Sequence, residues 1–151
     1  MFEDWPKLSS QKKLKKVVLI FVVSLGLNFL WENLHAGLYL HYQGQQVTEL
    51  ILLRAALFDA LVITLIFLTI IAIPAMRKFA VLWICSIALV FAILLEVYAL
   101  NTDRWAYTAI MPLVPLLKTG LLPTVQLALT AWVSLWSVNQ GLNREKFHEQ
   151  R

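Results

Sequence analysis

The amino-acid sequence predicts an all-α protein built as a four-helix transmembrane bundle. The chain has 151 residues, of which 60% are hydrophobic and only 15% are charged, and its mean hydropathy is +0.70. This composition leaves too little polar surface to cover a soluble globule of this size. Four apolar stretches are also long enough, at roughly 20 residues each, to cross a bilayer as helices. We therefore expect a single multi-pass domain, residues 1–151, in the cell membrane.

The predicted spans are residues 17–40, 50–73, 79–100 and 121–138. Lysines crowd residues 12–16 before the first span, Arg77 and Lys78 separate the second from the third, and Arg144 and Lys146 follow the fourth. Because cytoplasmic connections carry an excess of Lys and Arg, we expect both termini on the cytoplasmic side. The first apolar run is too long for a signal peptide, so an uncleaved first helix is expected.

The basic character of the chain points to a membrane surface and not to nucleic acid. The isoelectric point is near 9.4. Basic residues next to the spans are attracted to anionic lipid, which accounts for this value. The single Cys85 excludes an intramolecular disulfide and a cysteine-rich metal cluster.

The connection of residues 101–120 is predicted to be a proline-containing interfacial or re-entrant segment. Trp105 and Tyr107 suit the headgroup level of a membrane. The apolar piece that follows is interrupted by Pro112 and Pro115 and is too short to span. If the segment turns back into the membrane, Arg104 can reach the acidic residues of the spans. The alternative is an ordinary aromatic anchor with a surface arginine.

Acidic residues within the apolar runs are the strongest functional signal. Glu32, Asp59 and Glu96 lie in three different spans. A carboxylate in hydrocarbon is costly, so it is normally turned inward, paired or neutralised. At about 1.5 Å of rise per residue, Glu32 and Asp59 lie about 12 and 13 Å from the outer ends of their helices, and Glu96 about 6 Å. We therefore predict one polar chamber in the non-cytoplasmic half of the bundle, with Gln126 beside it.

A polar stripe is predicted on the first span. Asn28, Glu32, His35 and Tyr39 follow one another at spacings that place them on one helical face. For Asn28, as for Gln126 in the fourth span, the alternative is hydrogen bonding between helices, worth about 0.6 kcal/mol. Such bonding does not require a carboxyl group, so a functional role is favoured for Glu32, with His35 one turn away.

The other two acids each have a structural alternative. Alanines at positions 55, 56 and 60 surround Asp59 and let a neighbouring helix approach, so Asp59 is expected to face the bundle. Its alternative is an ion pair with Arg54, although a separation of five residues rotates the two side chains by about 140°. For Glu96 the alternative is a solvated position near the helix end.

Metal binding is considered because Glu32 and His35 form a Glu-x-x-His step, as in carboxylate-bridged di-iron bundles. Those sites need two such steps and further carboxylates, and the predicted spans contain one step. We predict no metal and no cofactor, with a mononuclear site of Glu32, His35, Asp59 and Glu96 as the open alternative. No glycine-rich phosphate loop is present in the sequence.

Acid–base chemistry on a lipid or isoprenoid fits these residues best. Carboxyl groups in a low-dielectric chamber separate into proton donor and proton acceptor. Aromatic side chains stabilise a developing carbocation, and Trp31, Trp105 and Tyr107 are candidates for this. These features predict an isomerase or cyclase whose partner is a membrane lipid or hydrophobic small molecule. Two alternatives stay open: a non-catalytic module that binds or transports a cation or amine, and an accessory subunit or homo-oligomer in a membrane complex.

The expected roles divide into two sets. The predicted catalytic residues are Glu32, Asp59, Glu96 and His35. The predicted substrate contacts are Asn28, Trp31, Tyr39, Arg54, Arg104, Trp105, Tyr107 and Gln126.

Several of these residues also carry a resemblance. The pattern comprises Trp31-Glu32, Asp59, Glu96, Arg104-Trp105-Ala106-Tyr107, Met111-Pro112, Gly120, Pro123 and Gln126. It resembles a group of small, uncharacterised four-helix bacterial membrane proteins over most of the chain, and this resemblance implies no activity. The layout is also similar to membrane isoprenoid cyclases and sterol isomerase-type bundles, which place acidic and aromatic residues inside a small helix bundle. That second likeness is an analogy of layout.

Overall fold

The computed structural model describes the backbone of residues 2–149 and the side chains of residues 2–140. Within this part of the chain the long helices are α1 (Ser10–His35), α2 (Glu49–Ala72), α4 (Ala80–Asn101) and α5 (Leu121–Glu149). The short elements are the 3₁₀ helices η1 (Trp5–Lys7) and η2 (Ala36–Leu38), the helix α3 (Pro74–Arg77), and the strands β1 (Tyr39–Tyr42) and β2 (Trp105–Tyr107). The four long helices are each long and apolar enough to cross a membrane.

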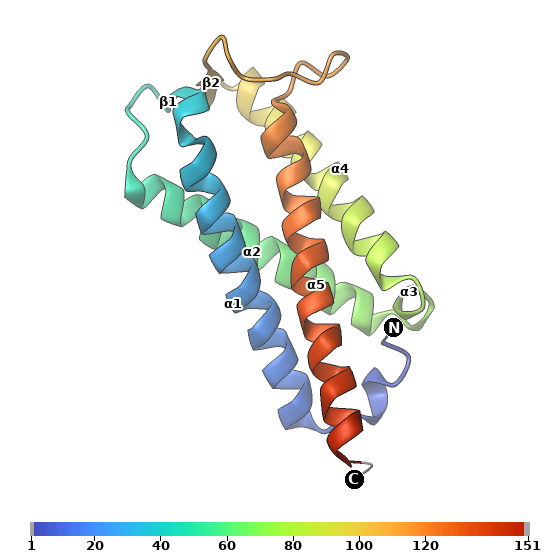
Figure 1. Ribbon diagram of the computed structural model, residues 1–151. Coiled ribbons are helices and arrows are strands. Elements are labelled where there is room, and N and C mark those ends of the chain that lie inside the picture. The colour runs from blue at the N-terminus through green and yellow to red at the C-terminus, as the bar shows by residue number, and fades with distance from the viewer. Residues whose placement is uncertain (1, 150–151) are drawn as a thin grey trace.

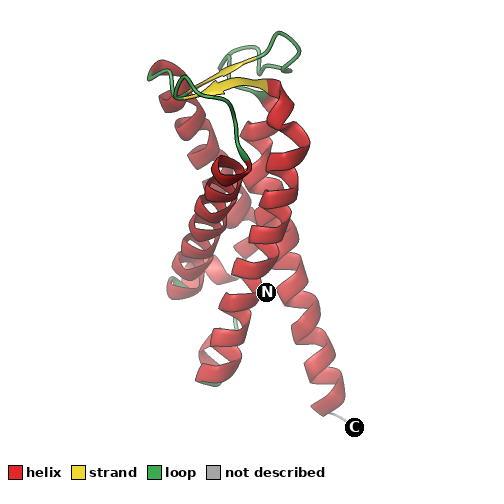
Figure 2. Ribbon diagram, turned by 90° about the vertical axis from the view of Figure 1, so that its left-hand side faces the viewer, coloured by secondary structure: helices red, strands yellow, loops and turns green. Residues whose placement is uncertain are grey.

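The long helices form one bundle (Figure 1). Helix α1 packs along α2 and α5, and α4 packs along α5. The strands and the connection of residues 102–120 lie at one end, whereas α1 begins and α5 ends at the other (Figure 1). We call these the strand end and the terminal end. Figure 2 shows the two strands lying across the strand end of the helices.

Each helix turns a stripe of small or apolar residues toward its neighbours. In α4 the buried residues are Ala80, Ile84, Ala88, Ala92, Glu96 and Ala99. Their spacing of three or four residues keeps them on one face, and the alanines let α5 approach closely. Glu96 is therefore buried because it occupies a position in this stripe. In α1 the same spacing runs through Ile20, Ser24 and Asn28.

The helix ends follow from local chemistry. Ser9 caps α1, since its hydroxyl accepts a hydrogen bond from the backbone N–H of Lys12. Helix α2 ends before Pro74, which lacks the N–H that a continuing helix needs. The predicted second and third spans agree with α2 and α4 to within one residue at each end.

The prediction that the first helix continues through Tyr39 is wrong. The helix α1 ends at His35, and Tyr39 begins strand β1. Strand β1 pairs antiparallel with β2, with Tyr39 opposite Tyr107 and Tyr42 opposite Trp105. This pairing satisfies backbone groups that the helix no longer satisfies. The predicted interfacial or re-entrant segment thus contains a strand, and it adds a two-stranded sheet to the helix bundle.

The terminal end of the bundle is packed with large apolar side chains. Ile20, Ile63, Phe67 and Leu135 have no exposed surface. The N-terminal segment closes this region, because the ring of Phe2 contacts the ring of Phe67 edge-on at a centroid distance of 5.5 Å. Glu32, Asp59 and Glu96 all lie nearer the strand end than this apolar packing.

The alanine stripe of α4 gives a prediction about stability. Ala88 is fully buried in the apolar core, whereas Val90 on the same helix is exposed. We expect Ala88→Leu to overpack this core and to cost about 1–3 kcal/mol, whereas Val90→Leu leaves stability unchanged. Thermal melting of the two variants in mild detergent measures the difference. Equal melting temperatures would show that α4 does not pack through this face.

Candidate functional site

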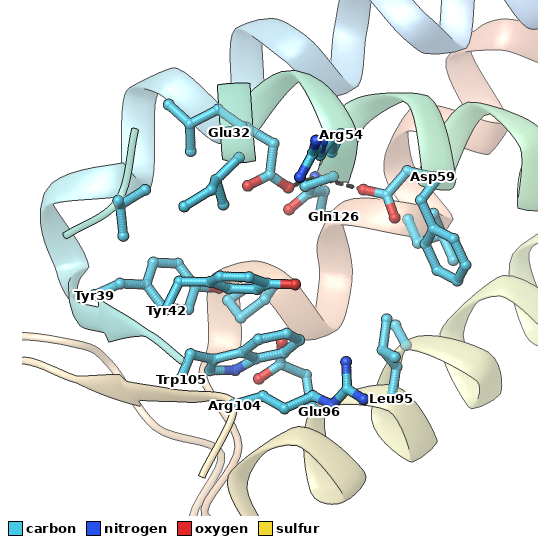
Figure 3. A pocket seen from close by; sticks show the side chains of 18 of the residues that line it. Glu32, Tyr39, Tyr42, Arg54, Asp59, Leu95, Glu96, Arg104, Trp105 and Gln126 are labelled. Atoms are coloured by element: carbon cyan, nitrogen blue, oxygen red, sulfur yellow. Dashed lines mark hydrogen bonds between the residues drawn. The ribbon is translucent and has the colours of Figure 1, made fainter. Parts of the chain in front are cut away.

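A cavity of about 360 Å³ lies at the strand end of the bundle, between the helices and the two strands (Figure 3). Glu32 of α1, Asp59 of α2 and Glu96 of α4 all line it. Apolar lining comes from Leu95 and Phe58, among others. The structure thus brings the three predicted acids to one chamber, although they lie on three different helices.

Gln126 of α5 links two of these acids, Glu32 and Asp59. Its side-chain nitrogen donates to Glu32 Oε1 at 2.8 Å and to Asp59 Oδ2 at 3.1 Å (Figure 3). The same nitrogen lies 3.1 Å from Asn28 Oδ1. A primary amide carries only two hydrogens, so these three acceptors share two donors. Gln126 therefore fixes one oxygen of each carboxyl group beside the other and leaves part of their hydrogen-bonding capacity open toward the cavity.

Asn28 lies behind this bridge and does not line the cavity. Its side-chain oxygen accepts a hydrogen bond from the hydroxyl of Thr130 at 3.2 Å, and its amide nitrogen donates to the carbonyl of Ser24 at 2.8 Å. Asn28 and Thr130 are both buried. The predicted substrate contact at Asn28 is thus replaced by a positioning contact that holds Gln126 between α1 and α5.

His35 stands beside Glu32. Its Nδ1 contacts the carbonyl oxygen of Trp31, and because a carbonyl can only accept, Nδ1 carries the hydrogen. The other nitrogen, Nε2, is 3.9 Å from Glu32 Oε2 and has no hydrogen-bond partner among the described residues. In the neutral ring this nitrogen presents a lone pair to a carboxyl oxygen.

Glu96 is only 4% exposed, so the alternative of a solvated position at the helix end is wrong. Its carboxyl group accepts a hydrogen bond from the hydroxyl of Tyr107, and that hydroxyl accepts one from the backbone N–H of Gly120 at 3.0 Å. The indole N–H of Trp105 is close to the same carboxyl group but lacks hydrogen-bond geometry and has no partner among the described residues. Tyr107 therefore ties Glu96 to the segment that leads into α5.

Aromatic rings from the two strands cover the cavity. Tyr42 and Trp105 are stacked at a centroid distance of 6.3 Å, and Tyr39 meets Trp105 edge-on at 6.2 Å. Figure 3 shows these three rings between the Glu32 side and the Glu96 side of the cavity. Burial raises the pKa of Tyr39 well above its usual range, and the nearby acids raise it further. Tyr39 therefore stays a neutral hydroxyl at physiological pH.

The remaining predicted residues divide between the cavity and its surroundings. Arg54 and Arg104 line the cavity. Trp31 is not among the lining residues, and its indole N–H is buried without a partner in the described part of the chain. Arg54 forms no ion pair with Asp59 among the described residues, and Asp59 is instead bound to Gln126.

Several lining residues were not predicted. They include His41, Tyr42, Phe58, Leu95, Tyr98 and Pro123. Tyr42 could have been identified from the aromatic-rich segment before Gln43 and Gly44, both of which have positive φ and form a turn. Phe58, Leu95 and Pro123 carry no local signal, because apolar residues on a lipid-facing surface and in a cavity look alike in sequence.

Within residues 2–140, no three His, Cys, Asp or Glu side chains are grouped closely enough to hold a metal ion.

In comparisons with known proteins, no family model, no curated protein and no solved structure matches the chain.

The Gln126 bridge gives a second prediction. In Gln126→Leu the acceptors on Glu32, Asp59 and Asn28 lose their shared donor, which we expect to cost about 1–3 kcal/mol of stability. Gln46→Leu, at an exposed position before α2, is the matched control. Thermal melting at neutral pH is the measurement, and a wild-type melting temperature for Gln126→Leu would refute the bridge.

Gly120 gives a third prediction. A Cβ atom there would lie 2.9 Å from Pro123 Cγ and 3.1 Å from the ring of Tyr107. We expect Gly120→Ala to displace Tyr107 from Glu96 and to cost about 1–3 kcal/mol. Gly37→Ala is the control, since a Cβ at Gly37 would meet open space. Melting curves compare the two, and equal stability would contradict the close contact around Tyr107.

Proposed function

We propose that the protein is an integral membrane enzyme that moves a proton on a lipid or isoprenoid substrate, by protonation, isomerisation or cyclisation. The observation that carries this proposal is the convergence of Glu32, Asp59 and Glu96 on a cavity whose other lining is largely apolar and aromatic. Such a site combines proton donors and acceptors with an apolar binding surface.

The outer surface of the bundle supports a membrane location. Large apolar side chains such as Leu30, Leu34, Leu65 and Leu94 are more than half exposed. An exposed belt of this kind is stable in lipid and unfavourable in water. In the proposed orientation both termini face the cytoplasm, and the cavity lies in the opposite half of the membrane.

The cavity opens sideways, which suits a substrate dissolved in the membrane. Among its lining residues, Phe58 of α2 is 45% exposed and Tyr98 of α4 is 51% exposed. Arg54 of α2 is exposed as well. The opposite wall is closed by the buried network around Gln126. An apolar substrate can thus enter between α2 and α4 without passing through water.

The two bridged carboxyl groups support a balanced proton transfer. A proton from the carboxyl group of Glu32 adds to one carbon of a double bond and leaves a carbocation at the other. The carboxylate of Asp59 then removes a proton from an adjacent carbon, and a shifted double bond forms. Return of that proton from Asp59 to Glu32 completes the cycle without net uptake or release. The rings of Tyr42 and Trp105 face the region where the cation develops.

A second candidate function is non-catalytic binding of a cation or amine. The observation in its favour is the same pair of stacked rings opposite carboxyl groups, which also suits an ammonium ligand. Transport through the bundle fits less well, because Ile20, Phe67 and Leu135 fill the terminal end beyond the cavity. An accessory subunit in a larger complex would also use the exposed apolar surface, but this role does not account for the cavity and its acidic lining.

The test of the proposed function compares lipids from cells that express wild type, Glu32→Gln or Asp59→Asn. We expect mass spectrometry with isomer separation to detect a product that falls about 100-fold or more in both variants, because each removes a proton-transferring group. Glu49→Gln, an exposed acid at the start of α2, is the matched control. Unchanged lipid products in all variants would overturn the proposal.

A further inference from the structure

Two arginines at the cavity are not explained by the proton transfer. Arg54 comes from α2, and Arg104 lies between α4 and β2. Both line the cavity and both are exposed. Figure 3 shows Arg54 on the side of Glu32 and Asp59, and Arg104 on the opposite side beside Leu95 and Glu96. The two guanidinium groups thus belong to facing walls.

Neither arginine forms an ion pair among the described residues, although three carboxyl groups line the same cavity. Arg104 lies over the ring of Tyr98, with its guanidinium carbon 5.3 Å from the ring centroid, and one of its nitrogens is 3.5 Å from the Tyr98 hydroxyl. The acids are instead bound by Gln126 and Tyr107. Both arginines therefore keep N–H donors available to bind an anion that enters the cavity.

The arginines lie nearer the strand end than the acids of their own helices. Arg54 precedes Asp59 by five residues in α2, which corresponds to about 8 Å along the axis. Arg104 follows the end of α4 at Asn101, whereas Glu96 lies within that helix. A ligand in the cavity would meet cationic groups at the rim and carboxyl groups deeper in the bundle.

The arrangement of the two guanidinium groups is better suited to binding a phosphate than a carboxylate. A guanidinium group binds oxyanions through a planar fork of N–H donors. A carboxylate offers two oxygens in one plane, which suit one such fork. A phosphate or diphosphate offers oxygens in several directions and can meet forks that approach from facing walls.

We infer that the substrate is an amphiphile with a phosphate or diphosphate headgroup, which Arg54 and Arg104 hold at the rim of the cavity. The inference rests on the proposed function and names its substrate class. The exposed side chains of Phe58 and Tyr98 flank the opening, so the alkyl or isoprenoid chain can extend between α2 and α4 into lipid. The carbons next to the headgroup then lie beside Glu32 and Asp59.

Dodecyl phosphate is the probe that tests this inference, because it has no double bond and binds without turnover. We expect it to raise the melting temperature of the full-length protein in maltoside detergent. Dodecyltrimethylammonium and dodecanoate carry the same chain length with a cationic or carboxylate head, and we expect both to bind at least about tenfold more weakly. Inorganic phosphate alone should bind too weakly to shift the melting curve.

The variants separate the headgroup site from the chemistry. Arg54→Gln and Arg104→Gln should each weaken dodecyl phosphate binding about tenfold or more, since each removes charged hydrogen bonds. Arg54→Lys and Arg104→Lys should give intermediate losses, because the charge stays and the fork is lost. Lys78→Gln removes an exposed charge outside the cavity and should bind like wild type. Arg104 lies outside the helices, so its variants report on binding even if Arg54→Gln folds poorly.

Three results would overturn the inference: preferential binding of dodecyltrimethylammonium, equal binding of dodecanoate, or wild-type binding by the folded arginine variants. A strong shift with inorganic phosphate alone would show a site for free phosphate and not for an amphiphile. Glu32→Gln should keep dodecyl phosphate binding whatever its effect on lipid products. Failure of the proton chemistry and failure of the headgroup site are therefore distinguishable.

Discussion

The structure depends on how an apolar bundle accommodates carboxyl groups. A carboxylate removed from water must recover hydrogen bonds or hold a proton, and otherwise it destabilises the fold by several kcal/mol. For Glu32 and Asp59 hydrogen bonds come from one side chain, the amide of Gln126, which contacts both. Because the three residues come from three helices, satisfying the acids also fixes how α1, α2 and α5 meet. The same contacts hold the two carboxyl groups side by side, which is the arrangement that the proposed proton transfer requires.

The two ends of the bundle differ in packing and in polarity. At the terminal end, aromatic and branched side chains such as Phe67 and Ile63 fill the space between helices. At the strand end, the helices are held apart around a cavity and are closed by a two-stranded sheet. The sheet is short, but it brings Tyr42 and Trp105 over the acids from segments far apart in the sequence. Rigid packing at one end thus allows a polar, partly open site at the other.

The sequence was sufficient to predict four long apolar helices and the convergence of the acids. The length of the apolar runs predicted α2 and α4 to within a residue at each end, and axial depth placed Glu32, Asp59 and Glu96 in the same half of the bundle. The strand containing Tyr39 was missed, since its partner β2 is more than 60 residues away and strand pairing is a long-range property. The contact of Tyr107 with Glu96, only 11 residues apart in sequence, was also missed, because it depends on where the strand β2 places Tyr107. Asn28 was assigned to the substrate because periodicity identifies a shared face but not which residue of that face reaches the cavity.

The central claim is that Glu32, Asp59 and Glu96 share a cavity that opens to the membrane. Labelling with an apolar carbodiimide tests it most directly, because the reagent enters from lipid and forms a stable adduct with a protonated carboxyl group. Mass spectrometry of the labelled protein in nanodiscs identifies the modified residues. The account predicts adducts at Glu32, Asp59 or Glu96. Adducts confined to exposed acids such as Glu49 and Asp103 would contradict it.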